Sequence, residues 1–264
     1  MSRHEHPSLR QGLIRAWCPS LGASGLTLID RSGQNAHGTL TNMAGQDNWQ
    51  ASGSGVALNF DGANDYVACG ATLTGAFTYS AWFWLRTFGP SGKIVHGSTT
   101  DGDLQCPIIA PTFTRLQSDT VGTGKNFTGT NSLLIWTHVC ATRQSDNLVS
   151  VFTNGVRSTT APQSVTGTFS LNSLGRYAGN TTYLWDGYLD DIRLYNRALT
   201  ASEIRLLASR RGIGLTPLPD RAAGMPRKLS INVGGTWRPA DAYVHDGTAF
   251  RLSEAKINVG GVWK

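Results

Sequence analysis

The chain has 264 residues, 31 of them glycine, and a formal net charge of +6. No run reaches the roughly 18 apolar residues of a membrane-spanning helix, and the polar opening MSRHEHPSLRQG lacks the apolar core of a signal peptide, so we expect no membrane span and synthesis in a cytoplasm. The positive charge is concentrated in residues 205–264, with ten basic and four acidic side chains, but no nucleic-acid-binding motif accompanies it, so no sequence-specific nucleic-acid partner is expected.

Strand patterns dominate most of the chain, after a polar stretch, residues 1–11, that we expect to form a loose arm. The longest pattern is FTYSAWFWLR, residues 77–86, in which Trp82 and Trp84 fall on the face opposite Phe83. Because both faces are apolar, we expect this strand to be covered on both sides. Further strands are expected at residues 12–17, 56–60, 66–69, 137–142, 149–153 and 187–195.

A helix is expected after the last of these strands, in TASEIRLLASRRG. Thr200 is a favourable N-cap, Glu203 completes a capping box, and Gly212 is a stop signal. The next segment, GLTPLPDRAAGMP, carries three prolines and indicates an extended linker. We therefore divide the chain into an arm at 1–11, a β-domain at 12–211, a basic proline-rich linker at 212–228 and a tail at 229–264.

The tail repeats one phrase, because INVGGTW at 231–237 returns as INVGGVW at 257–263, and VHDGTAFR between them follows a similar plan. Its large aromatic residues, Trp237, Phe250 and Trp263, are spaced by 13. Each copy has a glycine-containing dipeptide of the kind that forms tight hairpins, so we predict three β-hairpins. Because hairpins this small are marginal alone, the three aromatic residues are expected to serve assembly with other copies, with a particle or with the chain's own β-domain.

Six phrases occur in the order of a known family: GLIRAWCPS, LIDRSGQNAHGTL, ALNFDGANDYV, FTYSAWFWLR, WTHVCATR with VSVFTNGV, and GYLDDIRLYNRALTASEI. Together they resemble the laminin G-like family of the concanavalin A-like lectin/glucanase superfamily, over roughly residues 12–210. The resemblance implies an all-β fold, a two-sheet antiparallel jelly-roll sandwich with one C-terminal helix. The tail is similar to short Gly-Trp repeats in tail and fibre proteins of tailed phages, which implies virion attachment or assembly.

The resemblance implies carbohydrate binding, for which exposed aromatic rings stack on sugars and polar groups meet hydroxyls. Tryptophans of β-sandwiches are mostly core residues, so each candidate has a structural alternative. The candidates on expected loops are Trp49, Phe88, Phe127, Tyr183 and Trp185, with Asn126, Arg176 and Asn180 nearby.

The resemblance also implies calcium, a hard cation that takes carboxylate and carbonyl oxygens. Each candidate has an alternative role: a cap for the Asp-x-Ser-Gly turn, an Asp-Gly turn, or a pair with Arg193 or Arg31. The candidate ligands are Asp30, Asp61, Asp65, Asp190 and Asp191.

Glucanases of this superfamily cleave glycosides with glutamates that lie close together on one strand. The glutamates of this chain, Glu5, Glu203 and Glu254, fall in the expected arm, helix cap and tail, so no enzyme is predicted. We expect a non-enzymatic phage structural protein, a decoration, fibre or tail component located in the virion. Its expected partners are virion proteins, copies of itself and a host-surface glycan. The alternative is a secreted or cell-surface carbohydrate-binding module, and a glycan-cleaving enzyme is less favoured.

Overall fold

The computed structural model describes residues 6–43, 48–53, 55–87, 95–96, 108–110, 113–118, 124–129, 131–176 and 184–215, together with the backbone of the tail at 229–233, 236–240, 242–245, 250–253, 258–259 and 262–263. The chain divides into two compact units, a large one at Glu5–Thr216 and a small one that includes Pro217–Lys264. Each unit is described by itself.

The large unit is built on a sheet of nine strands, counted over the described residues, with β7 and β17 near its centre. The order is β14-β13-β12-β7-β17-β5-β4; β1 also pairs with β17, and β15 with β13. The strands are β14 (Val156–Arg157), β13 (Leu148–Thr153), β12 (Thr137–Arg143), β7 (Phe77–Leu85), β17 (Asp186–Tyr195), β5 (Val56–Asp61), β4 (Trp49–Ala51), β1 (Leu13–Trp17) and β15 (Gln163–Ser164).

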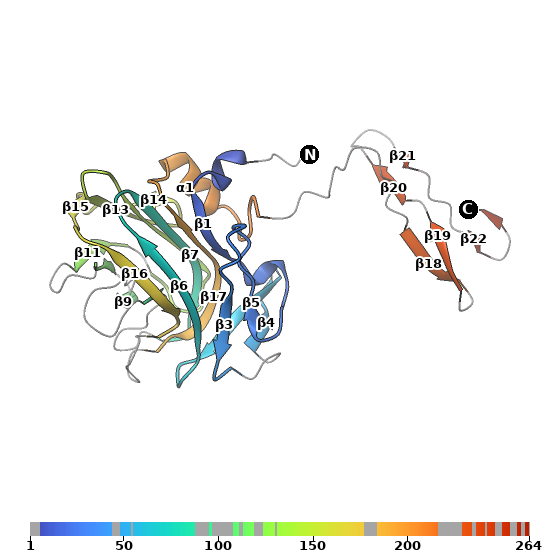
Figure 1. The fold of residues 1–264 in the computed structure, drawn as a ribbon, viewed down its shortest axis with the longest axis horizontal. Helices are drawn as coiled ribbons and strands as arrows, with labels where there is room; N and C mark the ends of the chain where they lie inside the picture. Colours follow the sequence, from blue (N-terminus) through green and yellow to red (C-terminus); the bar gives the residue numbers. More distant parts are fainter. Residues whose placement is uncertain are drawn as a thin grey trace. The chain divides into compact units, whose positions relative to one another are not determined.

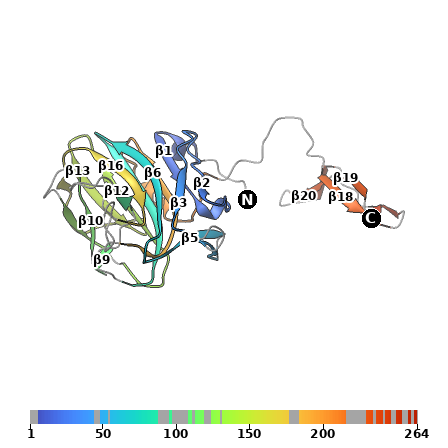
Figure 2. The ribbon, with the colours of Figure 1, turned by 60° about the horizontal axis from the view of Figure 1, so that its bottom comes forward.

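A second, smaller sheet covers the inner face of the first, so that β3, β6 and β16 form one layer and β7, β12 and β17 the other (Figures 1 and 2). Its described strands run in the order β2 (Thr27–Leu28), β3 (Gly38–Thr41), β6 (Tyr66–Leu73), β16 (Phe169–Leu174) and β8 (Val95–His96). A three-stranded sheet adds β11 (Lys125–Thr128), β10 (Phe113–Leu116) and β9 (Ile108–Ala110). All these strand pairs are antiparallel, and the predicted jelly-roll sandwich is confirmed.

Strand alternation explains the core between the layers. In β7 the residues Phe77, Tyr79, Phe83 and Leu85 point inward and belong to the main apolar cluster. The cluster also holds two tryptophans from other elements, Trp17 and Trp185. Because successive side chains point to opposite faces, the other half of β7 faces outward, away from the second sheet.

The outer face of the large sheet is partly covered by α1 (Ala201–Leu207) and by the short 3-10 helix Pro7–Arg10. A second apolar cluster lies there, and it includes Leu9, Ile204 and Leu207. The predicted capping box is present, because Thr200 and Glu203 bond each other's backbone amides. Among the described residues, no helix combines the length and the apolar character that crossing a bilayer takes.

Both expected boundaries of the β-domain need correction. Leu9 is 0 % exposed inside the second cluster, so the expected loose arm, 1–11, contributes to the core. At the other end, Ile213 and Leu215 are also buried in that cluster, so the domain continues to at least Leu215 rather than ending at Arg211. The reason is that short apolar segments at both ends fill the space that the seven-residue α1 leaves uncovered.

The three predicted tail hairpins are confirmed. They are β18 (Leu229–Val233) with β19 (Thr236–Ala240), β20 (Ala242–His245) with β21 (Phe250–Ser253), and β22 (Asn258–Val259) with β23 (Val262–Trp263). Trp237 lies opposite Asn232 and Trp263 opposite Asn258, so the repeated phrase adopts the same register twice. The expected aromatic cluster of the tail stays a prediction.

Candidate functional site

A row of aromatic residues crosses the outer face of the large sheet. Trp84 lies in the central strand β7, and its antiparallel partner in β17 is Tyr188. Trp136 comes directly before β12, where Thr137 pairs with Phe83, so Trp136 lies on the other side of Trp84. We call Trp84, Trp136 and Tyr188 the aromatic patch.

The rings of the patch are packed together and half-buried. The centroids of Trp84 and Tyr188 are 5.0 Å apart, and those of Trp136 and Tyr188 are 6.3 Å apart with an interplanar angle of 33°. Such tilted contacts are favourable for aromatic rings, and they leave part of each ring open to solvent. The patch therefore offers a broad apolar surface that is already ordered.

Arg86 fixes one side of the patch. Its guanidinium donates to the Asp186 carboxylate and to the Phe60 carbonyl, both at 2.8 Å, and also to Asn59 Oδ1. Its Cζ lies 5.0 Å from the ring centroid of Tyr188, within the range of a cation–π contact. Because a neighbouring carboxylate holds the cation, the ring and the arginine keep one arrangement.

Arg211 fixes the other side. Its Cζ lies 4.0 Å from the ring centroid of Trp136, and its guanidinium donates to the Ser52 carbonyl at 2.7 Å and the Ser52 hydroxyl at 2.9 Å. The same arginine reaches Asp190, with an N–O distance of 3.3 Å. The patch is therefore tied to a buried ionic network under it.

That network sits at a bulge in β17, where the register shifts between Asp190 and Arg193. Asp191 has a φ of +48° and holds Arg193 through two bonds of 2.7 and 2.9 Å, with both side chains at most 2 % exposed. Asp191 also accepts from the Gly212 amide, and Arg193 donates to the Ile213 carbonyl. The bulge thus clamps residues 211–215, including Arg211, onto the sheet.

Burial has a large effect on the pKa values here. Burial, followed by the neighbouring charge of Asp191, raises the pKa of Asp190 to about 6. Asp190 Oδ1 accepts from the amides of Ser20 and Asp191, which partly offsets this cost. Burial also lowers the pKa of His138 to about 3, so this imidazole is neutral.

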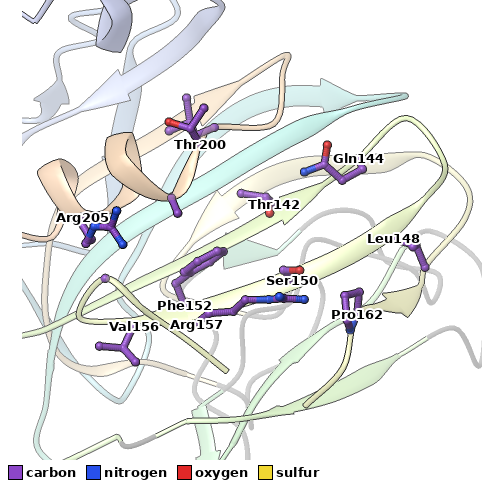
Figure 3. A pocket seen from close by; sticks show the side chains of 13 residues that line it. Thr142, Gln144, Leu148, Ser150, Phe152, Val156, Arg157, Pro162, Thr200 and Arg205 are labelled. Atoms are coloured by element: carbon purple, nitrogen blue, oxygen red, sulfur yellow. The ribbon is translucent and has the colours of Figure 1, made fainter. Parts of the chain in front are cut away.

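A groove of about 640 Å³ lies between α1 and strands β12 to β14. Figure 3 shows Thr200 and Arg205 on the helix side, across from Phe152, Ser150 and Arg157 on the strands. None of its 13 lining residues, all within the described part of the chain, is acidic. The charged residues of the groove are Arg157 and Arg205, so it is basic and contains no carboxylate pair for glycoside cleavage.

A serine–histidine contact lies beneath the outer face. Ser80 Oγ lies 2.8 Å from His138 Nε2. The two residues are 1 % and 0 % exposed, and the ring of Trp82 lies 5.3 Å from that of His138. Trp82 is itself held by a bond to the Leu207 carbonyl at the end of α1. No glycan can reach this pair while the fold is intact, so it is a structural contact.

The structure corrects the expected positions of three aromatic candidates. Phe127 and Trp185 are 0 % exposed and Trp49 is 8 % exposed, and all three belong to the main core. The Trp49 indole also donates to the Gly25 carbonyl. They were expected on loops, but they lie in or beside strands whose inner face carries them. They cannot stack on a ligand at the surface.

The remaining candidates do not form one site. Asn126 is exposed in β11, and its carbonyl accepts from Gln163. Arg176 lies over Tyr66, with 3.2 Å from its Cζ to the ring centroid, beside the smaller sheet. Phe88, Asn180 and Tyr183 lie outside the described residues.

The calcium candidates are also dispersed. Asp30 accepts from the amides of Ala16, Ser32 and Ala36, and so organises the predicted turn. Asp61 accepts from the Ala63 amide.

Asp65 accepts from the Asp61 amide and from Asn48, while Asp190 and Asp191 face arginines. Over the residues that the structure describes, no three His, Cys, Asp or Glu side chains gather as a metal site. Each of the five carboxylates accepts at least one N–H bond of its own, and they do not gather into one cluster. Calcium binding stays a prediction from the resemblance alone.

The patch residues were missed by sequence reasoning, although a signal was present. The alternation in β7 placed Trp82 and Trp84 outward, but we expected both to be covered. Trp82 and Trp84 are both half-buried: the Trp82 indole donates to the Leu207 carbonyl at the end of α1, and Trp84 packs against Tyr188. The partners Tyr188 and Trp136 required the register of β17 and β12, which the sequence does not provide.

Comparisons with known proteins agree with this architecture. The family model described as the concanavalin A-like lectin/glucanases superfamily matches residues 61–205. No curated protein matches the sequence. Among solved structures, domain 4 of AbnA, a GH43 extracellular arabinanase from Geobacillus stearothermophilus in complex with arabinotriose, is similar with a TM-score of 0.56 and 18 % identity, covering 74 % of this chain and 98 % of that one.

Two further solved structures are longer chains, and a part of each is similar to this chain. Trypanosoma rangeli sialidase gives a TM-score of 0.53 at 19 % identity, covering 75 % of this chain and 32 % of that one. Botulinum neurotoxin type C, whose cell entry depends on interaction with two ganglioside molecules, gives 0.55 at 14 % identity, covering 76 % and 52 %. At these identities the likeness shows the fold.

Proposed function

This chain belongs to the concanavalin A-like lectin/glucanases superfamily, and from that premise we propose that it is a non-enzymatic glycan-binding protein whose aromatic patch receives the sugar. The observation that carries the proposal is the half-exposed row of Trp84, Trp136 and Tyr188 on the outer face. Sugar rings present apolar C–H faces that stack on aromatic faces, and a binding site needs few polar groups to orient the ligand.

The groups around the patch supply that orientation. Asp186, beside Arg86, is part-exposed and provides carboxylate oxygens for sugar hydroxyls. Because Arg86 and Arg211 hold Tyr188 and Trp136 in place before any ligand arrives, little conformational entropy is lost on binding. The arabinotriose complex of AbnA domain 4 and the ganglioside dependence of the neurotoxin support a glycan as the ligand class.

The non-enzymatic part of the proposal rests on the acids and bases that the structure describes. Glu203 is engaged in the capping box of α1 and in an ion pair with Arg197. Asp190 and Asp191 are buried against arginines, and the Ser80–His138 pair is sealed. No two of these carboxylates flank the groove or the patch as an acid and nucleophile pair does.

The tail supports a proposal about where the protein is located. The first and third hairpins pair in the same register, with Asn232 opposite Trp237 and Asn258 opposite Trp263, which supports a repeated attachment or self-assembly module. We propose that this module attaches the sandwich to a phage particle as a decoration, fibre or tail component. Mass spectrometry of purified virions tests this location. A virion protein is expected in the particle, and a secreted or cell-surface module is expected to be absent from it.

The binding test is a glycan array probed with the full chain, including arabinotriose, ganglioside oligosaccharides and bacterial surface polysaccharides. Replacement of Tyr188 by Ala is expected to weaken binding of any hit by about tenfold or more. Tyr66→Ala is the matched control, because it removes a tyrosine that is also stacked by an arginine, Arg176, but beside the other sheet. Loss of binding in Tyr66→Ala with none in Tyr188→Ala contradicts the proposal, and circular dichroism checks that both variants fold.

A further inference from the structure

Three consecutive apolar side chains project next to the aromatic patch. Leu133, Leu134 and Ile135 are 36 %, 59 % and 58 % exposed, and they directly precede Trp136. We call these three residues the apolar tip. Single exposed apolar residues are common on protein surfaces, but consecutive ones at the edge of a binding surface mark a contact region.

The backbone holds the tip in an unfavourable conformation. Leu134 has a φ of +60°, a region that glycine and asparagine adopt readily and that a bulky residue rarely enters. Its amide donates to the Leu85 carbonyl at 2.9 Å, and Leu133 forms a bridge with the same residue. Leu85 belongs to the buried end of β7, so the tip is anchored on the core of the sheet. The strained leucine is therefore kept outward by the fold instead of folding back onto it.

The residues at the base of the tip have amphipathic side chains. Trp136 and Tyr188 are half-buried rings, and Arg211 and Arg86 lie against them. Aromatic rings and arginines of this kind favour the boundary between lipid headgroups and acyl chains, where an apolar body and a polar end are both satisfied. Apolar side chains beyond such a belt reach the acyl chains.

The size of the tip favours a lipid over a protein partner. A stable protein interface buries about 800 Å² on each partner, which three side chains on one turn cannot provide. A few apolar side chains together with cations suffice for a reversible membrane contact.

We propose that the apolar tip inserts into the outer boundary of a lipid bilayer, so that the glycan bound by the patch is one linked to a lipid. The glycan half of this statement rests on the proposed function, but the insertion of the tip does not.

The test uses vesicles of phosphatidylcholine and phosphatidylglycerol, and a flotation assay of the full chain. The double variant Leu134→Ser with Ile135→Ser is expected to lower the partition coefficient by about tenfold for each substitution. Leu26→Ser is the matched control, since Leu26 is 56 % exposed, lacks a positive φ and is expected to leave binding unchanged. Quenching of tryptophan fluorescence by brominated lipids gives a second readout. We expect part of the wild-type fluorescence to be quenched and this quenched part to be absent in Trp136→Phe.

Each other outcome counts against the inference. Equal partitioning of the double variant and the wild type into vesicles overturns it. If both proteins bind equally at low salt and both lose binding at high salt, the contact is made by the basic residues after Arg205. If the wild type self-associates in sedimentation velocity and the double variant does not, with no change in flotation, the tip is a protein interface. The glycan array tests the proposed function separately, because soluble glycans do not need the tip.

Discussion

Asp191→Asn probes the buried network that carries the patch. Asparagine keeps the shape of the side chain, tolerates the φ of +48° and can still accept from the Gly212 amide. What it removes is the negative charge opposite Arg193, which is 0 % exposed and bonded to Asp191 at 2.7 and 2.9 Å. Loss of one partner of such a buried pair costs about 3–5 kcal/mol of unfolding free energy, because the other charge stays desolvated.

This loss is a large fraction of the unfolding free energy of an ordinary domain, which is about 5–15 kcal/mol. Urea unfolding of the full chain, followed by near-ultraviolet circular dichroism, is expected to show a lower midpoint with an unchanged slope. The control is the double variant Asp191→Asn with Arg193→Met, which removes both charges and keeps an apolar chain of similar length. We expect it to recover at least half of the loss.

Two results refute this reasoning. A loss below about 1 kcal/mol for Asp191→Asn means that water or another group compensates the charge of Arg193. A double variant as unstable as the single one means that the bond from Arg193 to the Ile213 carbonyl, rather than the charge, holds residues 211–215 in place.

Four other outcomes are expected. The pKa of Asp190 is raised to about 6 in the folded protein, so folding favours the protonated carboxyl, and this stabilisation is lost as the pH rises through the folded pKa. Between about pH 4 and pH 7 the wild type should therefore lose about 2 kcal/mol of unfolding free energy relative to Asp190→Asn, and equal pH profiles of the two proteins contradict this. Leu134→Gly should be more stable than Leu134→Ala by about 1 kcal/mol in thermal unfolding, whereas Gly should be the less stable substitution at Leu26; the same order at both positions refutes the strain. Limited proteolysis with mass analysis should leave a folded fragment that retains Leu215, and a stable fragment ending before Ile213 speaks against the clamp. Trp263→Ala should reduce assembly or particle incorporation with the sandwich still folded, and unchanged incorporation removes the tail as the attachment module.

Local sequence signals predicted several elements correctly, because they depend on short-range chemistry. The capping box of Thr200 and Glu203 is present as expected. The Asn154-Gly155 dipeptide makes the two-residue turn that such dipeptides favour, with positive φ at both positions. In the tail, Val233 pairs with Thr236, as the expected tight hairpin requires. In each case a few neighbouring residues determine the conformation.

The site could not be predicted because it depends on contacts between distant segments. Trp136, Tyr188 and Arg211 meet only after three strands pair and residues 211–215 dock. The helix was expected to continue to Gly212, but it ends at Leu207, and Arg211 beyond it bonds Ser52. The resemblance likewise implied aromatic residues for stacking without showing which ones the inner face would bury.

The most direct test of the account is a crystal structure of the chain soaked with an oligosaccharide that the glycan array selects. The account predicts a sugar ring stacked on Tyr188 or Trp84, at roughly the 3.5–4.0 Å of van der Waals contact, with a hydroxyl bonded to Asp186. A sugar bound instead beside Tyr66 and Arg176 on the smaller sheet, with the aromatic patch empty, contradicts it.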